Sequence, residues 1–270
     1  MNFLHSFEPS RVLIQVGPIT LYWYGFFIVS GILAAILTAI RLGRKYGLDK
    51  NLIIDLAFWL TLFGILGARI YDDLLEIRYY LGHPLDSVKI WQGGLAIHGA
   101  IIAGILTIYL FSRRKKLDFW LLSAVIAPAI ALGQAIGRWG NYFNQELFGS
   151  PTGLPWGIPI DLLNRPLGYV SYRYFHPTFL YESLGNLLIF FLLLGLHRRL
   201  TGENKFRKIV FYYLIAYSVL RFSTEFIRID FAPVFLGLRV PQIASLLIIA
   251  LSLLLLKNKK NHDSINNSSH

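Results

Sequence analysis

Seven apolar stretches, each long enough to cross a lipid bilayer, dominate this sequence. They lie near residues 19–40, 52–76, 95–112, 121–137, 178–197, 209–227 and 237–256. A membrane-spanning helix needs roughly 17–25 such residues. Only 15% of the residues are charged, against about 25% in an average soluble domain. The sequence therefore predicts an all-α polytopic membrane protein with seven transmembrane helices and excludes a water-soluble fold.

Basic residues gather in alternate loops between these stretches. Sixteen of the 26 Lys and Arg lie in four groups: Arg41, Arg44, Lys45 and Lys50; Arg113, Arg114, Lys115 and Lys116; Arg198, Arg199, Lys205, Arg207 and Lys208; and Lys257, Lys259 and Lys260. The positive-inside rule puts these loops in the cytoplasm, the N-terminus outside and the C-terminus cytoplasmic. This topology accounts for the net charge of +11, so we expect no nucleic-acid partner.

The remaining segments are short. We expect a single integral membrane domain over 1–256 and a disordered cytoplasmic tail over 257–270, which is polar and low in complexity. The Gly- and Pro-rich segment at about 138–177 predicts a small extracytoplasmic cap in which the run 169–175 can form a strand. Residues before the first helix lack the basic start of a signal peptide and predict an interfacial arm.

Polar side chains recur inside the predicted spans, where a central arginine costs about 2.5–3.5 kcal/mol. Spacings of four, four and three put Tyr217, Arg221, Glu225 and Arg228 on one stripe of the sixth helix. The other helices carry Gln134, Arg138 and Asn141; Arg239, Gln242 and Ser245; Glu182 and Asn186; Arg69, Asp72 and Asp73; and His98, about one turn inside the third helix. With the predicted topology, these groups converge on the outer half of the bundle.

An excess of arginine in the outer half of the membrane indicates an anionic ligand, since the guanidinium suits phosphate. A phospholipid headgroup is within reach, which leaves an enzyme acting on that headgroup or a carrier of anionic solutes. The i,i+4 pairs Arg221–Glu225 and Arg69–Asp73 also fit purely structural ion pairs. A metal at Asp72, Asp73 and Glu76 is disfavoured by the neighbouring Arg69 and Arg78.

Several motifs identify a family. Residues 137–149 (GRWGNYFNQELFG) resemble the signature GRxGNFxNxExxG of prolipoprotein diacylglyceryl transferases. Trp23-Tyr24-Gly25 resembles the first-helix motif of that family, and residues 93–99 resemble its histidine motif. Residues 176–182 match its HPxxLYE element and residues 221–228 its RFxxExxR element. The motifs follow the family order over residues 17–245.

The resemblance implies a function. Enzymes of this family transfer the diacylglyceryl group of phosphatidylglycerol to the lipobox cysteine of a preprolipoprotein signal peptide, form a thioether and release glycerol phosphate. This is the first step of bacterial lipoprotein maturation. It implies a multi-pass protein of the bacterial plasma (inner) membrane, surrounded by membrane lipids, with its active site facing the outer leaflet. We expect no cofactor and no metal. The chain has no cysteine, consistent with a nucleophilic sulfur supplied by the substrate.

The resemblance also implies roles for individual residues. Arg138 and Arg221 are the candidates for binding the lipid phosphate and stabilising its growing charge. His98 is the candidate for accepting the thiol proton, although it could instead orient the lipid while the arginine field favours the thiolate. The further candidates for binding phosphatidylglycerol are Asn141, Asn144, Glu146, Gly149, Tyr24, Tyr181, Tyr217 and Glu225.

Three positions depart from the family pattern, and two other classes remain as alternatives. Ala100 replaces a glycine, Val240-Pro241-Gln242 replaces Met-Gly-Gln, and Tyr71-Asp72-Asp73 is more acidic than usual. A carrier or flippase is disfavoured because no internal repeat is visible and the polar residues lie in one half of the membrane. An alcohol phosphatidyltransferase would need a DGxxAR-type motif, which the sequence lacks.

Overall fold

The computed structural model is mostly helical and describes residues 3–266, with the side chains of all of these except 3, 92 and 258–266. The chain divides into two compact units. Unit 1 contains Met1–Ala35 and Ile126–His270, and unit 2 contains Ile36–Val125. Helices α2 and α6 each contribute to both units. The single membrane domain expected over 1–256 stays a prediction.

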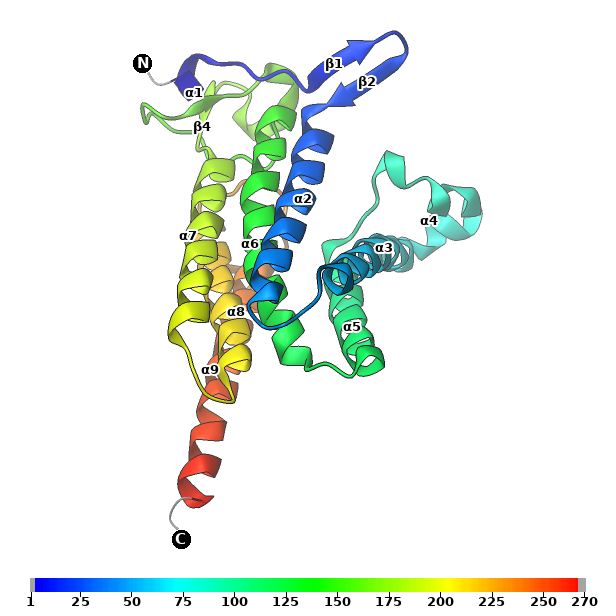
Figure 1. Cartoon of the computed structure of the whole chain (residues 1–270). Helices are drawn as coiled ribbons and strands as arrows, with labels where there is room; N and C mark the ends of the chain where they lie inside the picture. The colour runs from blue at the N-terminus through cyan, green and yellow to red at the C-terminus, as the bar shows by residue number, and fades with distance from the viewer. Residues whose placement is uncertain (1–2, 267–270) are drawn as a thin grey trace. The chain divides into compact units, whose positions relative to one another are not determined.

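Unit 1 is a helical bundle whose helices run alongside one another in Figure 1. Its helices are the first part of α2 (Trp23–Arg44), most of α6 (Phe119–Asn144), α7 (Thr178–Arg199), α8 (Lys205–Thr224) and α9 (Val240–Asn266). Helix α8 packs against both α7 and α9. Helices α2 and α6 approach closely at Gly31, where an added Cβ would lie 3.0 Å from the Gly133 carbonyl oxygen. Such small residues let membrane helices pack backbone to backbone.

Short strands and turns cover one end of unit 1 (Figure 1). These are α1 (Phe3–Ser6), the hairpin β1 (Val12–Val16) and β2 (Ile19–Tyr22), the pair β3 (Ile158–Pro159) and β4 (Tyr174–Phe175), and the turns η3 (Leu162–Asn164) and η4 (Leu167–Tyr169). A further hairpin, β5 (Val234–Phe235) and β6 (Leu238–Arg239), directly precedes α9. A buried apolar cluster that includes Tyr142, Phe148, Phe175 and Phe179 joins this cap to α6 and α7.

Unit 2 is built on two long helices, α3 (Lys50–Leu75) and α5 (Ile97–Lys115). Between them lie α4 (Ile77–Gly82), η1 (Pro84–Val88) and η2 (Ile90–Gln92). The Asp49 side chain caps α3 by accepting a hydrogen bond from the Asn51 amide at 2.7 Å. Helices α3 and α5 touch at two glycines, since a Cβ on Gly99 would lie 2.0 Å from the Gly67 carbonyl oxygen.

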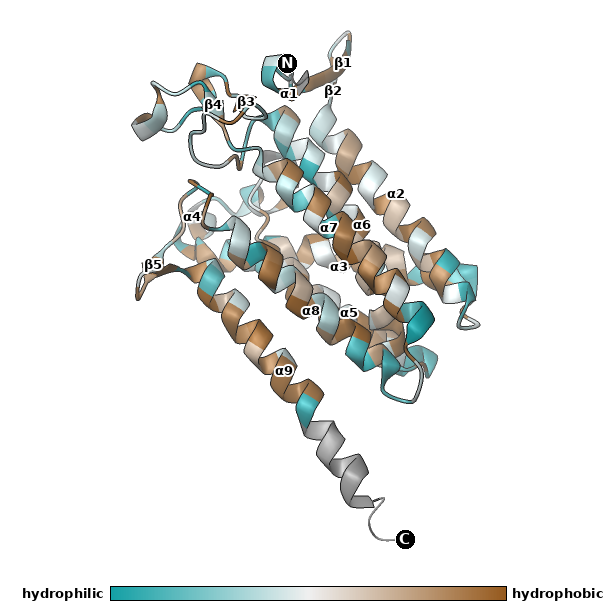
Figure 2. Cartoon of the chain, turned by 90° about the vertical axis from the view of Figure 1, so that its left-hand side faces the viewer, coloured by the Kyte–Doolittle hydropathy of each residue, from teal (hydrophilic) through white to brown (hydrophobic). Residues whose placement is uncertain are grey.

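Five helices are long and apolar enough to cross a membrane: Trp23–Arg44, Lys50–Leu75, Phe119–Asn144, Thr178–Arg199 and Val240–Lys257. Figure 2 shows hydrophobic residues along the sides of these helices, and many large apolar side chains there are exposed. Helices α5 and α8 form where the sequence predicts spans, but α5 ends in Arg113, Arg114 and Lys115 and α8 begins at Lys205. The structure thus supports a multi-pass membrane protein, and the seven-span topology stays a prediction.

Several predicted boundaries differ from the helix and strand ends in the structure. Residues 19–22 form strand β2, so the first long helix begins at Trp23 rather than at 19. Helix α6 continues to Asn144, so residues 138–144 of the segment expected to form the cap are helical. Only 174–175 of the expected strand 169–175 is a strand. Of the tail over 257–270, α9 extends to Asn266 and 267–270 lie outside the described residues.

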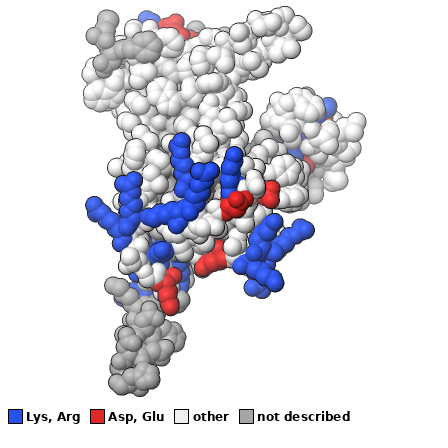
Figure 3. Space-filling model, in the orientation of Figure 1, with Lys and Arg blue, Asp and Glu red and all other residues white. Residues whose placement is uncertain are grey.

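The two ends of unit 1 differ in charge. On the face shown in Figure 3, the β1–β2 hairpin carries no Lys or Arg, and basic side chains gather toward the turn between α7 and α8. Arg198 and Arg199 end α7, and Lys205, Arg207 and Lys208 begin α8. Cations near the end of α7 also complement its helix dipole.

Candidate active site

A single buried carboxylate, Glu182 in the second turn of α7, holds three arginines together. The Nε atom of Arg138 from α6 lies 2.8 Å from Glu182 Oε2. Arg228 Nη1 donates a hydrogen bond to Glu182 Oε1 at 3.1 Å, and Arg221 Nη1 from α8 lies 3.5 Å from the same oxygen. The Glu182 side chain is only 4% exposed. Two helices and the loop after α8 therefore converge on one residue of a third helix.

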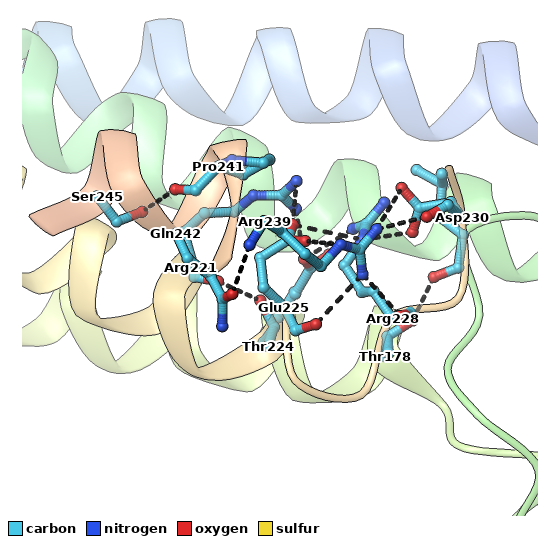
Figure 4. Close-up of polar contacts among 12 residues, drawn as sticks. Thr178, Arg221, Thr224, Glu225, Arg228, Asp230, Arg239, Pro241, Gln242 and Ser245 are labelled. Carbon is cyan, nitrogen blue, oxygen red and sulfur yellow. Dashed lines mark hydrogen bonds and ion pairs between the residues drawn. The ribbon is translucent and has the colours of Figure 1, made fainter. Parts of the chain in front are cut away.

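Glu225 forms a second centre at the C-cap of α8 (Figure 4). Its carboxylate pairs with Arg221, one helical turn earlier, and lies 3.0 Å from Arg239 Nε. Arg228 Nε is 3.8 Å from the same carboxylate. Because Arg221 and Arg228 contact both Glu182 and Glu225, the two acidic residues belong to one network.

Asp230 completes this network in the loop before β5. Its Oδ1 accepts a hydrogen bond from Arg228 Nε at 2.8 Å, and Arg239 donates to the backbone carbonyl of Asp230. Partial burial opposes ionisation of Asp230, but the hydrogen bond from Arg228 and the charges of Arg228 and Arg239 prevail and lower its pKa. Arg239 also donates to the Arg228 carbonyl at 2.6 Å. Backbone and side chains of this loop are thus fixed around the arginines.

The four arginines differ in accessibility. The side chain of Arg228 is 3% exposed, whereas those of Arg138 and Arg221 are 20% and 23% exposed. Arg239 is 15% exposed, but its guanidinium is bound to Glu225 and to the backbone carbonyls of Arg228 and Asp230. Arg138, Arg221, Arg228 and Arg239 face three carboxylates, those of Glu182, Glu225 and Asp230, which leaves one positive charge in excess. Arg138 and Arg221 can therefore receive an anion, while Arg228 and Arg239 fix the surrounding chain.

Gly149 lies where three segments cross. Its amide donates to the His176 carbonyl at 2.9 Å, and it forms a β-bridge with Arg228. A Cβ at this position would lie 2.8 Å from the His176 Cβ and 3.0 Å from the Ile227 carbonyl oxygen. The glycine thus lets the end of residues 137–149 pack against both the start of α7 and the loop carrying Arg228.

The loop after α6 presents polar groups to a cavity of about 390 Å³. Asn141 Nδ2 donates to Glu146 Oε1 at 2.7 Å. Gln145 and Leu147 adopt left-handed backbone conformations, which turn the chain sharply. The cavity is lined by Asn144, Glu146 and Asp230, together with Arg11, Gln145, Leu147, Phe148, Asn164, Pro166 and Ile229.

The three candidate tyrosines occupy different surroundings in unit 1. Tyr24 packs beside Gly140, where an added Cβ would lie 2.9 Å from the Tyr24 ring. The charges of Arg138 and Glu146 act on the Tyr24 hydroxyl. The Tyr181 hydroxyl accepts a hydrogen bond from Trp156 Nε1 at 2.9 Å. Tyr217 stacks near Tyr213 in α8, with ring centroids 6.1 Å apart. Tyr24 thus packs against α6 at Gly140, and Tyr217 lies one helical turn before Arg221 in α8.

Comparison with known proteins connects this geometry to a family. The family model for prolipoprotein diacylglyceryl transferase matches residues 11–257. The chain belongs to the prolipoprotein diacylglyceryl transferase family. It is 44% identical over 251 residues to the phosphatidylglycerol–prolipoprotein diacylglyceryl transferase of Synechococcus elongatus, covering 92% of this chain and 86% of the relative. It is 46% identical over 254 residues to the protein of the same name from a Synechocystis species, covering 92% and 89%. The resemblance inferred from the motifs is confirmed.

His98, the candidate base of this family member, lies in unit 2. It is the second residue of α5, which begins at Ile97, so its expected place one turn inside the helix was wrong. The side chain is exposed, and its ring centroid lies 5.8 Å from that of Tyr71. The arginines and the other candidate residues lie in unit 1, and the part of His98 in the site stays a prediction.

Other polar residues of the family motifs were placed differently from our expectation. Helix α8 ends at Thr224, so the stripe from Tyr217 to Arg228 is not one continuous helix. Arg239 lies in β6, just before α9, rather than inside the seventh helix. Asp73 pairs with Arg69 at 3.2 Å, as the alternative of a structural pair predicts. Among residues 3–266, no cluster of acidic or histidine side chains is arranged to hold a metal ion.

His176, at the start of the HPxxLYE element, should make the stability of the folded protein depend on pH. Burial lowers its pKa below the ordinary value of 6.5, so the unfolded chain binds more protons than the folded one just below that pH. We expect the apparent Tm in detergent to fall as pH decreases from 7.5 through 6.5 toward 5. His176→Gln should reduce this fall, and His83→Gln, which changes an exposed histidine, should leave it intact. Equal pH profiles for His176→Gln and wild type would contradict the assignment.

Proposed function

We propose that this protein transfers the diacylglyceryl group of phosphatidylglycerol to the lipobox cysteine of preprolipoproteins, as the names of its relatives state for them. The observation that carries the proposal is the pair of accessible arginines, Arg138 and Arg221, held side by side on Glu182. Their planar donors match the oxygens of a phosphate in both charge and geometry. The family membership of residues 11–257 supports the same substrate class.

The reaction exchanges a carbon–oxygen bond for a carbon–sulfur bond. The cysteine sulfur attacks the carbon of the diacylglycerol unit that is bonded to the phosphate oxygen. The bond between this carbon and that oxygen breaks with its electron pair on oxygen. Glycerol phosphate leaves as a monoester with more negative charge than the diester had. Arg138 and Arg221 stabilise that added charge in a site of low dielectric, where preorganised donors have their largest effect. The thiol proton goes to a base.

We assign the base role to His98. A free thiol has a pKa near 8.5, so only a few per cent is thiolate at neutral pH, and a neutral imidazole near pH 7 is suited to accept the proton. Near-intact turnover by His98→Gln would remove the base assignment and leave the family membership unchanged. The scheme requires no metal and no cofactor.

The remaining candidates surround the headgroup in this proposal. Asn141 orients Glu146 through their hydrogen bond of 2.7 Å, and Asn144 and Glu146 face the cavity of about 390 Å³. These groups can hold the glycerol hydroxyls. Tyr24 packs against Gly140 of α6, Tyr181 directly precedes Glu182 in α7, and Tyr217 lies one turn before Arg221 in α8. Glu225 keeps Arg221 in place through their ion pair, and Gly149 provides close packing.

We further propose that seven helices cross the plasma membrane with the N-terminus outside and the cap and active site on the outer leaflet. The basic ends of α5, α7 and α8 support a cytoplasmic location for the opposite side. In that orientation, the site faces secreted precursors, whose lipobox cysteine lies at the outer end of a signal peptide. The protein then serves bacterial lipoprotein maturation at its first step.

A mass measurement tests the proposal. Purified protein in mixed micelles with phosphatidylglycerol should add one diacylglyceryl mass to a lipobox peptide and release one equivalent of glycerol phosphate. A Cys→Ala peptide should remain unmodified, which assigns the sulfur as acceptor. Arg173→Gln, which changes an exposed arginine of the cap, should retain wild-type turnover. An unmodified Cys peptide with folded protein would reject the transferase and favour an anion carrier.

A further inference from the structure

Arg69 is a buried arginine of α3 that the proposed mechanism does not use. Its side chain is only 8% exposed, although it belongs to a helix apolar enough to span a membrane. Intramembrane arginines are costly unless their donors are paired. The partners of Arg69 therefore indicate what the residue does.

The guanidinium of Arg69 binds the segment 86–94, which leads from α4 into α5. Its Nε donates to the Ser87 carbonyl at 2.8 Å, and its Nη1 donates to the carbonyls of Gly93 and Gly94 at 2.9 and 3.0 Å. Its Nη2 donates to the Asp86 carbonyl. One side chain thus joins both ends of this segment to α3, using the planar fork that only arginine offers.

One acidic residue and an aromatic ring contact the guanidinium, and a second acidic residue holds that ring. Asp73 Oδ1 lies 3.2 Å from Arg69 Nε, and the Tyr80 ring lies 4.8 Å from the Arg69 Cζ. The Tyr80 hydroxyl donates to Asp72 Oδ2 at 3.2 Å. Asp73 therefore orients Arg69 directly, and Asp72 orients it through Tyr80.

The same stretch of α3 also fixes the first turn of α5. The Ala96 amide donates to the Ala68 carbonyl at 3.1 Å. Gly94 has φ of +71°, and a Cβ there would lie 2.3 Å from Arg69 Nη1. Tyr71 lies two residues after Arg69 in α3, and its ring lies beside the ring of His98. Residues 67–71 thus hold the chain on both sides of the point where α5 begins.

We propose that Arg69 is a positioning residue for His98. By binding residues 86–94 it holds the start of α5 against α3, so that the His98 ring keeps one place beside Tyr71. The inference rests on the proposed function, in which His98 accepts the substrate proton. A misplacement of about 1 Å in such a group can cost roughly 10²-fold in rate.

A double-mutant cycle tests this inference. Arg69→Gln should lower kcat for the lipobox peptide by about 10²-fold and leave the KM for phosphatidylglycerol within about twofold. In a His98→Gln background the same change should alter kcat less than about twofold, because the positioned group is gone. Arg69→Lys keeps the charge, but its three donors are all on one nitrogen and cannot replace the arginine fork. Its kcat should therefore resemble that of Arg69→Gln. The matched control is Arg78→Gln, which changes an exposed arginine of the adjoining α4.

Hydrogen exchange separates this inference from the proposed function, because it does not depend on turnover. Arg69→Gln should speed amide exchange over 84–98 and leave exchange in α7, α8 and α9 unchanged. Unchanged exchange over 84–98 would overturn the inference whether or not wild type forms product. Equal losses of kcat in both backgrounds, or full turnover by His98→Gln, would overturn it as well. If Arg69→Gln does not fold, Arg69→Lys carries both measurements.

Discussion

Arg138→Gln is expected to lower kcat for diacylglyceryl transfer by about 10²–10³-fold, the usual loss when one preorganised donor to a developing anion is removed. Arg138 is 20% exposed and lies 2.8 Å from Glu182 through its Nε. Its two terminal nitrogens have no ion-pair partner among the described residues, so they are available to a phosphate. Glutamine keeps a polar side chain, but it is shorter and supplies no charge.

Single-turnover mass spectrometry with saturating phosphatidylglycerol measures the loss in the chemical step. Arg138→Lys should recover little, because an ammonium group cannot reproduce bidentate contact with phosphate. Arg173→Gln serves as the control for loss of one arginine from unit 1. A decrease of kcat smaller than about threefold in Arg138→Gln, against the 10²-fold expected for a direct donor, would remove Arg138 from charge stabilisation. A rise in KM alone would restrict it to uniform lipid binding.

Local spacing predicted two of the ion pairs, one in the arginine network and one in unit 2. The pairs Arg221–Glu225 and Arg69–Asp73 are i,i+4 neighbours, and both are ion pairs in the structure. Residues three or four apart on a helix must lie on one face, so their proximity follows from helical geometry alone. Arg228 also lies near Glu225, at 3.8 Å, but both residues follow the last residue of α8, so this contact depends on the loop rather than on helical spacing.

The central position of Glu182 could not be predicted this way. It is 44 positions from Arg138 and 46 from Arg228, and helical spacing sets no distance between different helices. The only sequence signal was a glutamate in an apolar helix, within an element resembling the family motif. Asp230 gave less signal still, because its contact with Arg228 depends on the turn that follows Thr224.

Sequence periodicity also failed to predict where the helices end. The stripe at 217–228 continues the helical spacing, yet α8 stops at Thr224, whose hydroxyl donates to the Arg221 carbonyl at 3.1 Å. Beyond it, Arg228 and Arg239 bind carboxylates and backbone carbonyls of the loop. These tertiary contacts outweigh the local preference for a further helical turn. Apolar pattern alone therefore extended the sixth span by three residues, to 227.

Glu182→Ala is expected to lower the free energy of unfolding by about 3–5 kcal/mol, the usual effect of breaking a buried ion pair from one side. Removing this carboxylate leaves the positive charges of Arg138, Arg221 and Arg228 less fully neutralised. Arg228 is most affected, since its side chain is 3% exposed and donates directly to Glu182 at 3.1 Å. For a chain of this size, the apparent Tm in detergent should fall by at least about 6 °C.

Tryptophan fluorescence during heating measures this shift, and Glu8→Gln provides the matched control. Glu8 also pairs with an arginine, Arg173, but both side chains are more than half exposed. Exposed pairs contribute about 0–1 kcal/mol, so Glu8→Gln should leave Tm nearly unchanged. Equal Tm values for Glu182→Ala and wild type would show that the arginines do not depend on Glu182.

Inorganic phosphate extends the same experiment to the ligand. An anion that binds the folded state raises Tm by mass action, and the site lacking Glu182 has a larger excess of positive charge. Phosphate should therefore raise the Tm of Glu182→Ala more than that of wild type, while an equal ionic strength of chloride should not. Introducing Arg138→Gln into Glu182→Ala should reduce the phosphate effect, because Arg138 is one of the two accessible arginines. If phosphate raises both Tm values equally, the arginine network is not where the anion binds.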